Sequence, residues 1–278
     1  MSFYTSLSGL KNAQTDLNVI SNNIANAETS GFKKSDTSFA DIVASSALAD
    51  SSHTVGIGSR VATITQNFSL GAINQTGGAL DITINGDGFF TVKSPLSGET
   101  QYTRNGALTI DGSSYIVNAQ GARLQAFPTD PVTGAITSTS TLQDVQIPAA
   151  SPNPKDPANP GSYAGVTIGK NGQIIATYSD GSNATLGVVA VASFLAPTGL
   201  RQLGDSTWAA SGNSGAATYA QPGSGTTASL LSGSLEGSNV DIAEELVSLI
   251  TAQRNFQANA KAIDTATQIS QAIMNLRS

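Results

Sequence analysis

The chain has 278 residues, carries 13 Lys and Arg against 19 Asp and Glu, and contains one His and no Cys. The absence of cysteine excludes disulfide scaffolds, cysteine nucleophiles and thiolate metal sites, and a single histidine excludes metal sites that need two. The net charge of −6, with the basic residues scattered along the chain, argues against a nucleic-acid-binding surface. With 39% apolar residues the chain can still bury a core, and its length suggests one to two domains.

The first six residues lack the basic and then apolar pattern of a cleavable signal peptide, so removal of a leader is not expected. No apolar run along the chain approaches the roughly 18 to 20 residues that cross a bilayer. These two observations predict a protein without a membrane-spanning segment.

The N-terminal residues predict an amphipathic helix. Apolar side chains recur there with spacings of four and three residues, which places them on one helical face. They are Phe3, Leu7, Leu10, Leu17 and Ile24. Ala13 and Ile20 widen this stripe. The helix is expected to run from about Phe3 to Asn26, with Ser30-Gly31 ending it.

The central part of the chain predicts short antiparallel strands. Tight turns are marked by Asn-Gly and Asp-Gly pairs, because these residues tolerate positive φ. The pairs are residues 85–86, 105–106, 111–112, 171–172 and 180–181. A longer apolar strand is expected from Leu186 to Phe194. The other expected strands are Leu80–Ile84, Phe89–Lys93, Tyr115–Val117 and Gln173–Tyr178.

Three segments have the composition of loops. Residues 151–161 contain four prolines in eleven positions, which predicts an extended linker or loop within the strand region. Residues 44–58 and 211–227 are rich in Ser, Ala, Gly and Thr and are expected to be loose.

The C-terminal residues predict the longer helix. Ser238-Asn239-Val240-Asp241 has the form of an N-cap followed by an acid three residues later. Apolar residues then follow the same spacing, at Ile242, Leu246, Leu249, Phe256, Ala260, Ile263 and Met274. No Pro or Gly occurs from Val240 to Ser278, so an unbroken helix would be roughly 55 Å long, too long for the surface of a compact domain. Two such helices indicate pairing with each other or with other copies, and two ordinary helices packed on the central domain are the simpler alternative.

Groups that could carry chemistry are sparse. His53 lies in a low-complexity stretch and is expected to be a loop residue rather than a catalytic base. Residues 85–88 lack the spacing of a calcium loop, and the acids of residues 241–245 complement a helix dipole. Trp208 is expected to be a core aromatic rather than a recognition residue. We therefore predict no catalytic, cofactor-binding or metal-binding residues and no enzymatic activity.

Long and specific motifs occur at both ends of the chain. The N-terminal motifs are Ser8–Leu10, Leu17–Asn26 and Gly31–Lys33, and the C-terminal motifs are Ser238–Asp241, Glu245–Val247, Ala252–Asn259 and Asn275–Arg277. Together they resemble the signatures of the flagellar rod and hook axial proteins. The resemblance continues through residues 85–90, 102–106 and 204–210, so it covers nearly the whole chain.

Within that family, residues 205–210 and 253–259 look more similar to hook subunits than to distal rod subunits. Many hook proteins are longer and carry an extra β domain inserted in the central one. The proline-rich residues 151–161 stand roughly where that insertion would be, so the chain resembles a minimal hook subunit. Its length is also near that of a rod protein, and a distal rod subunit stays the alternative.

The pattern and the resemblance together predict an α+β fold. Long N- and C-terminal helices are expected to pair as a coiled-coil-like axial domain, with a central antiparallel β-rich domain. The expected divisions are residues 1–70, with the first helix and a connecting segment, residues 71–237, with the strands, and residues 238–278, with the last helix. Flexible joints are expected near residues 32–64 and 228–237.

The resemblance implies a subunit that polymerises into a curved helical tube, the flagellar hook, which transmits motor torque from rod to filament as a universal joint. The implied partners are further copies of the chain, the distal rod protein, the hook cap, the hook-filament junction proteins and the export apparatus, with no nucleic acid and no membrane insertion. It also implies an extracellular position in the hook and basal body, reached by type III export without a cleaved signal. A secreted adhesin or enzyme is the alternative from another class.

The apolar stripes of the two helices predict the surface through which copies assemble. The residues expected in this interface are Phe3, Leu7, Leu10, Leu17, Ile20, Ile24, Leu246, Leu249, Ile250, Phe256, Ala260, Ile263 and Ile273.

Overall fold

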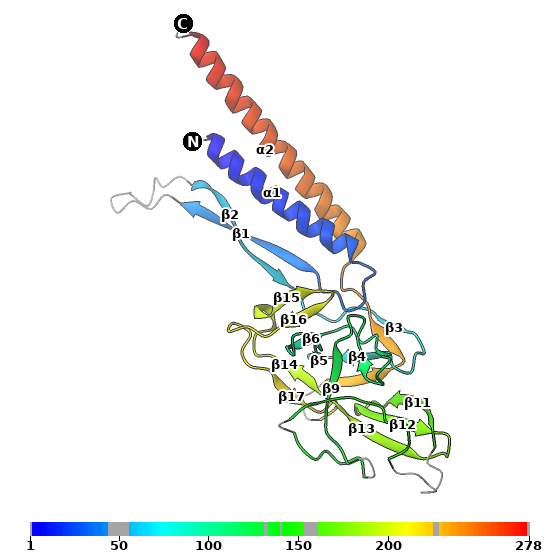
Figure 1. The fold of residues 1–278 in the computed structure, drawn as a ribbon. Helices are drawn as coiled ribbons and strands as arrows, with labels where there is room; N and C mark the ends of the chain where they lie inside the picture. Colours follow the sequence, from blue (N-terminus) through cyan, green and yellow to red (C-terminus); the bar gives the residue numbers. More distant parts are fainter. Residues whose placement is uncertain are drawn as a thin grey trace. The chain divides into compact units, whose positions relative to one another are not determined.

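A computed structural model describes residues 2–43, 56–130, 133–139, 141–152, 161–224 and 228–276. The chain forms two compact units, each built from segments distant in sequence (Figure 1). The helical unit comprises Met1–Ala27, Lys34–Asn67 and Val240–Ser278. The strand unit comprises Glu28–Lys33 and Phe68–Asn239. His53 and most of the proline-rich residues 151–161 lie outside the described residues.

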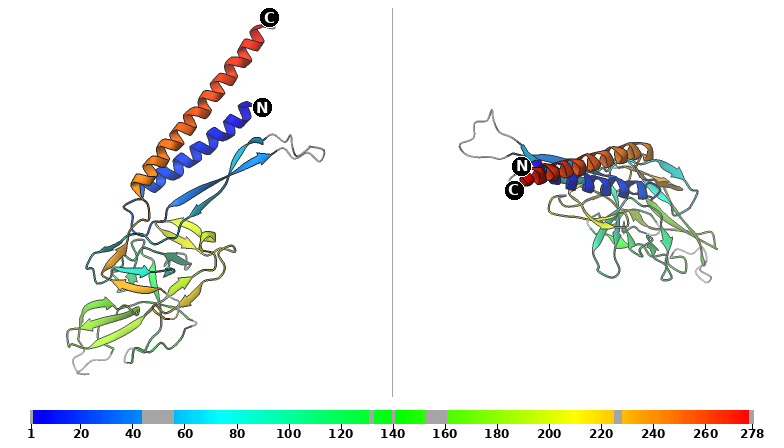
Figure 2. Two further views of the ribbon diagram at one scale, coloured as in Figure 1. Left: turned by 180° about the vertical axis from the view of Figure 1, so that it is seen from behind. Right: turned by 90° about the horizontal axis from the view of Figure 1, so that it is seen from above.

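The helical unit consists of two long helices and one hairpin. Helix α1 (Ser2–Ala25) lies beside helix α2 (Ile242–Leu276), and both views of Figure 2 agree with this arrangement. Strands β1 (Ser35–Val43) and β2 (Gly56–Gln66) pair in antiparallel fashion and pack against α1. The two predicted helices are confirmed to within a few residues of their ends.

Helix α2 begins later than the sequence motif indicated. The Oδ1 atom of Asp241 accepts hydrogen bonds from the backbone N–H groups of Ala243 and Glu244, at 2.8 and 3.2 Å. Asp241 therefore caps the helix, whereas Ser238 was the expected N-cap. The reason is that residues up to Asn239 belong to the strand unit, so the helix can begin only after the chain has left it.

In the two segments expected to be flexible joints, the described residues include paired strands. In the first, β1 and β2 pair from Ser35↔Gln66 to Val43↔Gly56, with register shifts at two places. In the second, β18 (Ser229–Ser232) pairs with β4 (Ile82–Asn85), and β19 (Ser234–Glu236) pairs with β3 (Ile73–Gln75). These pairings satisfy backbone groups through partners distant in sequence, which local composition does not reveal.

The strand unit is built around a large antiparallel sheet in the order β11-β12-β13-β9-β5-β6-β16-β15. Its central strand β5 (Phe89–Lys93) pairs with β6 (Thr100–Thr103), β9 (Arg123–Phe127) and β14 (Val191–Ser193). The remaining strands are β7 (Thr109–Ile110), β8 (Ile116–Val117), β10 (Gln143–Asp144), β11 (Tyr163–Ile168), β12 (Gln173–Tyr178), β13 (Asn183–Val189), β15 (Arg201–Gly204), β16 (Thr207–Ala209) and β17 (Thr218–Ala220). With the two helices, this sheet makes the fold α+β, as predicted.

The long strand expected from Leu186 to Phe194 is two strands. Strand β13 pairs with β9 and β12, whereas β14 pairs with β5 and β17. Ala190 separates them and is fully buried. The apolar run is continuous because both pieces are buried, so hydropathy alone could not show where the partner strand changes.

The hydrophobic core of the strand unit has three clusters. The largest joins residues from Ile82 to Leu230 and includes Phe90, Leu124 and Ile174, each with no exposed surface. A second cluster surrounds Trp208, which is 1% exposed and stacks edge-on against Phe68 and Phe89. The expectation that the single tryptophan is a core aromatic is confirmed.

Candidate assembly surface

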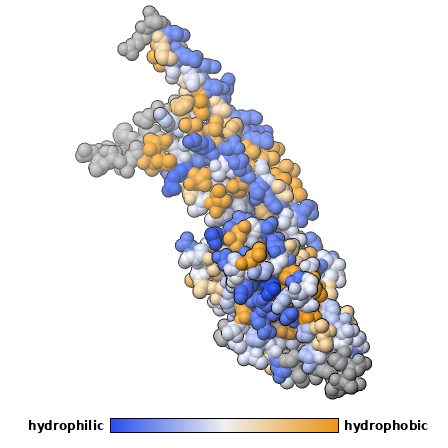
Figure 3. Space-filling model, viewed as in Figure 1, coloured by the Kyte–Doolittle hydropathy of each residue, from blue (hydrophilic) through white to orange (hydrophobic). Residues whose placement is uncertain are grey.

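The helical unit exposes large apolar side chains along both helices and on the hairpin. On the face drawn in Figure 3, hydrophobic residues are spread over this unit between hydrophilic ones. The exposed members are Phe3, Tyr4, Phe39, Val43, Ile57, Ile64, Ile242, Leu246, Val247, Ile250, Ile269, Ile273 and Met274. These exposed apolar side chains make the helical unit the candidate assembly surface.

The residues predicted for the interface differ in how far the single chain already covers them. Ile20 is buried within the chain. The half-buried residues are Leu7, Leu10, Leu17, Ile24, Leu249, Phe256, Ala260 and Ile263. The exposed residues are Phe3, Leu246, Ile250 and Ile273. The apolar stripe is therefore only partly satisfied by the contacts within one copy.

Helices α1 and α2 approach closely at Gly9. A Cβ atom at this position would lie 2.6 Å from Oδ1 of Asn259, so only glycine fits without a shift of that side chain. On the other side of α1, the Nδ2 atom of Asn12 donates a hydrogen bond to Oγ of Ser59 at 2.7 Å. These contacts seat α1 between α2 and the hairpin.

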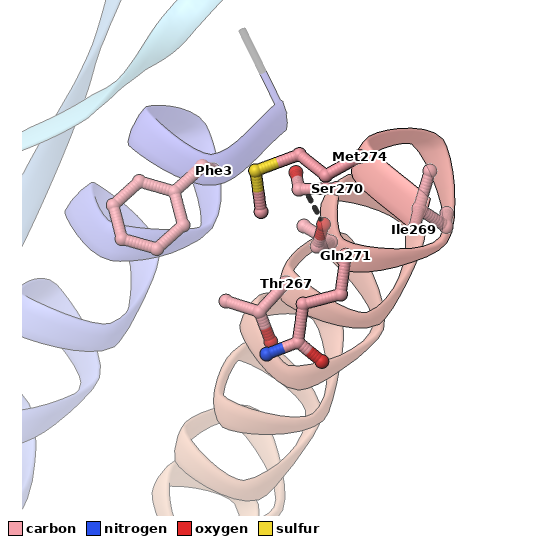
Figure 4. Close-up of a pocket in the computed structure, with 7 residues that line it drawn as sticks. Phe3, Thr267, Ile269, Ser270, Gln271 and Met274 are labelled. Carbon is pink, nitrogen blue, oxygen red and sulfur yellow. Dashed lines mark hydrogen bonds between the residues drawn. The ribbon is translucent and has the colours of Figure 1, made fainter. Parts of the chain in front are cut away.

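An open groove lies between the first turn of α1 and the C-terminal part of α2 (Figure 4). Its volume is about 460 Å³, and it is lined by Phe3, Ala266, Thr267, Ile269, Ser270, Gln271 and Met274. Phe3 comes from α1, and all the other lining residues come from α2. Helix α2 has 35 residues and α1 has 24, so the end of α2 has no counterpart on α1 to cover it. Met274 and Ile269 are 65% and 57% exposed.

At the other end of the helices, polar contacts hold the unit together. Buried Asn23 donates through Nδ2 to the backbone oxygen of Ser35 at 3.0 Å and to Oε2 of Glu245 at 3.3 Å, and its Oδ1 accepts from the backbone N–H of Ser35 at 3.0 Å. This one side chain links α1, β1 and α2. Partial burial raises the pKa of nearby Asp16 above its ordinary value.

The strand unit contains a buried ionic cluster that sequence reasoning did not find. Oε1 of Glu236 accepts a hydrogen bond from Nζ of Lys33, and Oε2 lies 3.4 Å from Nη1 of Arg104. The three side chains are at most 2% exposed. Burial lowers the pKa of Lys33, and the Glu236 carboxylate works against this lowering. Lys33 stands in one of the terminal motifs, but its partner lies 203 positions away, so no local signal pairs them.

Among the described residues, no group of three or more His, Cys, Asp or Glu side chains is placed to hold a metal ion. None of the described helices is long and apolar enough to cross a membrane.

Three family models match the chain. The model described as "Flagella basal body rod protein" matches residues 3–33, the model "Flagellar hook protein FlgE/F/G D1 domain" matches residues 83–176, and the model "Flagellar basal body rod FlgEFG protein C-terminal" matches residues 231–276. The matched segments include α1, much of the strand unit and α2.

Full-length relatives include both rod and hook proteins. The flagellar basal-body rod protein FlgG of Bacillus subtilis is 34% identical and covers 99% of this chain and 98% of its own length. FlgG of Buchnera aphidicola subsp. Baizongia pistaciae is 31% identical, over 95% of this chain and 94% of its own. The flagellar hook protein FlgE of Salmonella typhimurium is 28% identical with full coverage of both chains, in an alignment of 411 positions that exceeds the 278 residues present here.

Proposed function

The chain belongs to the flagellar rod and hook proteins, which are structural subunits and not enzymes, and we propose that it polymerises into the flagellar hook. The observation that carries this proposal is the apolar surface of the helical unit. Both of its helices expose large apolar side chains that a single copy cannot cover. Burial of such surface drives association, and head-to-tail contacts that do not close generate a helical tube.

In the proposed tube, the two helices of each copy pack with those of neighbouring copies in a coiled-coil-like arrangement. Residues 1–70 and 238–278 act as the axial part, and residues 71–237 act as a separately folded body. Polar positions within the apolar stripes, at Gln14, Ser21, Gln253 and Thr267, are all exposed in the single copy. Exchange of contacts at polar positions strands no charge, so these positions permit the small shifts that a bending joint requires.

Motifs and overall identity favour different answers to whether the chain is a hook or a distal rod subunit. Residues 205–210 and 253–259 resemble hook subunits, and a hook relative aligns from end to end. The distal rod is the second candidate, because the flagellar basal-body rod protein FlgG of Bacillus subtilis is more similar, at 34% identity over an alignment of 287 positions. We favour the hook on the motifs, and the curvature of the polymer distinguishes the two.

The proposed partners follow from this position. They are further copies of the chain, the distal rod protein, the hook cap, the hook-filament junction proteins and the export apparatus. The proposed location is the hook and basal body outside the cell, reached through the flagellar export channel without a cleaved signal.

Electron microscopy of the concentrated, purified protein tests the proposal directly. A hook subunit is expected to form curved tubes, and a rod subunit straight ones. A protein that stays monomeric under all assembly conditions contradicts the structural role and favours an adhesin.

Two variants test which surface carries assembly. Leu17→Asp and Ile263→Asp each place a charge in the apolar stripe and are expected to abolish sedimentable polymer. Gln268→Asp adds the same charge at an exposed polar position of α2 and serves as the matched control. Trp208 emission should show that the strand unit stays folded in all three. Normal tubes from both stripe variants would refute the assignment of the helices to the interface.

A further inference from the structure

The polypeptide passes between the helical unit and the strand unit four times, after Ala27, Lys33, Asn67 and Asn239. In the strand unit, three short stretches of chain lie next to these crossings. They are residues 28–33, the residues that follow Asn67, and the residues that precede Val240. These stretches contain the covalent connections of the strand unit to the helical unit.

Two of these stretches are bonded to one residue of the third, Glu236. Its backbone oxygen accepts a hydrogen bond from the backbone N–H of Gly31 at 2.8 Å. Its Oε1 atom accepts from Nζ of Lys33 and from the backbone N–H of Gly71 at 3.1 Å. Nζ of Lys33 also donates to the backbone oxygen of Ser69 at 2.6 Å. Glu236 itself lies four residues before the last crossing.

Arg104 connects Glu236 to the rest of the strand unit. Its Nη1 atom lies 3.4 Å from Oε2 of Glu236 and donates to the backbone oxygen of Gly86 at 2.9 Å. Its guanidinium group stands over the ring of Phe89, 5.3 Å from the centroid, and Phe89 belongs to the aromatic cluster around Trp208. Through Arg104, Glu236 is therefore linked to the hydrophobic core.

Backbone packing at the crossings is equally tight. Gly31 has φ of +70°, and a Cβ atom there would lie 2.6 Å from the backbone nitrogen of Asn105. A Cβ atom at Gly71 would lie 2.3 Å from the backbone oxygen of Gly237. Gly31 and Gly71 pack directly against the backbone of Asn105 and Gly237. A side chain at either glycine would require movement of that backbone.

We propose that Glu236 is a clamp that fixes all four crossings to the strand unit, so that load from the helical unit enters the core through this buried cluster. The carboxylate is held between two buried cations, and a partner removed from such a group leaves a charge without compensation. Loss of one member of this cluster is therefore expected to release all four crossings and not one alone. The mechanical consequence rests on the proposed function, whereas the clamp itself is a property of the single chain.

Amide hydrogen exchange on the full-length monomer tests the clamp. In Glu236→Gln and in Lys33→Met, we expect exchange at Gly31 and Gly71 to accelerate at least about tenfold, which corresponds to ~1.4 kcal/mol. In these variants Gly31 and Gly71 should also exchange faster than the amides of β5 and β9, because the crossings then open without unfolding of the core. Glu28→Gln is the matched control, because Glu28 is an exposed acid in the same stretch as Lys33.

Unchanged exchange at Gly31 and Gly71 in both variants would overturn the proposal. Exchange of Gly31 and Gly71 at the same rate as β5 and β9 in both variants would also overturn it, because the crossings would then open only when the whole core unfolds. If Glu236→Gln fails to fold, Lys33→Met leaves the Glu236 carboxylate paired with Arg104 and supplies the test, and failure of both to fold counts against a clamp. Tube formation is not used in this experiment, so failure of the proposed function would leave its result intact.

Discussion

The two units of the chain solve the problem of burying apolar side chains in different ways. In the strand unit, three clusters enclose residues such as Phe90, Leu124 and Trp208 almost completely. In the described part of the helical unit, the buried apolar residues are Ala13, Ile20 and Ala252, and two of these are alanines. The larger side chains of its helices stay half-buried or exposed.

This difference indicates which unit can stand alone. A unit that encloses its apolar side chains gains most of its stability from its own sequence. A unit that leaves Leu246, Ile250 and Ile273 exposed gains stability when another surface covers them. The helical unit is therefore expected to be the less stable part of the monomer and the part that assembly stabilises.

The largest expected effect is a difference in amide exchange between the units. In dilute monomer, amides of α2 beyond Phe256 should exchange at least about a thousandfold faster than those of β5 and β9, because the core strands exchange by global unfolding, which costs about 5 kcal/mol or more. Hydrogen exchange with mass spectrometry measures this. Strong protection of both Leu7–Ile24 and Leu246–Ile273 would break the comparison.

The next largest effect is expected from a cavity in the strand unit. Leu124→Ala removes a side chain with no exposed surface and should lower the free energy of unfolding of this unit by about 2–5 kcal/mol. Urea unfolding followed by Trp208 emission measures it. Leu96→Ala is the matched control, because Leu96 is 98% exposed and should change stability by less than about 0.5 kcal/mol. Equal losses in both variants would contradict the assigned core.

A polar substitution should weaken the helical unit selectively. Asn23→Ala removes the hydrogen bonds to Ser35 and Glu245 and should destabilise that unit by about 1–3 kcal/mol, because buried groups lose their partner. Helical circular dichroism of the monomer should melt earlier while the Trp208 transition stays in place. Asn22→Ala, at an exposed position of the same helix, is the control. A shift of the Trp208 transition would show that the units do not unfold separately.

The smallest effect is expected at the surface of the strand unit. Partial burial acts to raise the pKa of Asp144, but hydrogen bonds from Gln125 and Arg123, at 2.7 and 3.0 Å, outweigh it and hold this pKa below 3.8. The folded state therefore favours the carboxylate, so its stabilisation is complete above that value and is lost as the pH falls through the folded-state pKa. Asp144→Asn should lower the urea midpoint slightly at pH about 7 and should match the parent at pH about 2. A difference that persists in acid would contradict this origin.

The helices and several strands could be predicted because their signals are local. Spacings of four and three residues place side chains such as Leu7 and Leu10 on one face of any helix, whatever surrounds it. Asn171-Gly172 forms a tight turn before β12, and Gly172 has φ of +76°, a conformation that glycine adopts without a steric penalty. These features depend on neighbouring residues alone.

Other features depended on partners distant in the chain. Local composition predicts neither the β1–β2 hairpin nor the division of the apolar run at Ala190, because pairing between strands decides both. The sequence motifs identified the family and the stripe of residues on each helix. They did not indicate that Ile20 would be covered within one copy while Leu246 would stay exposed.

By itself, the sequence determined the two amphipathic helices, the antiparallel character of the middle and the flagellar axial family, because periodicity, turn residues and motifs are all written in neighbouring positions. Only the tertiary structure decided which apolar side chains remain uncovered and that Glu236 meets Lys33, Gly71 and Arg104 in one buried cluster. The physical reason is that burial and charge pairing are properties of contacts, and these contacts join positions as far as 203 residues apart.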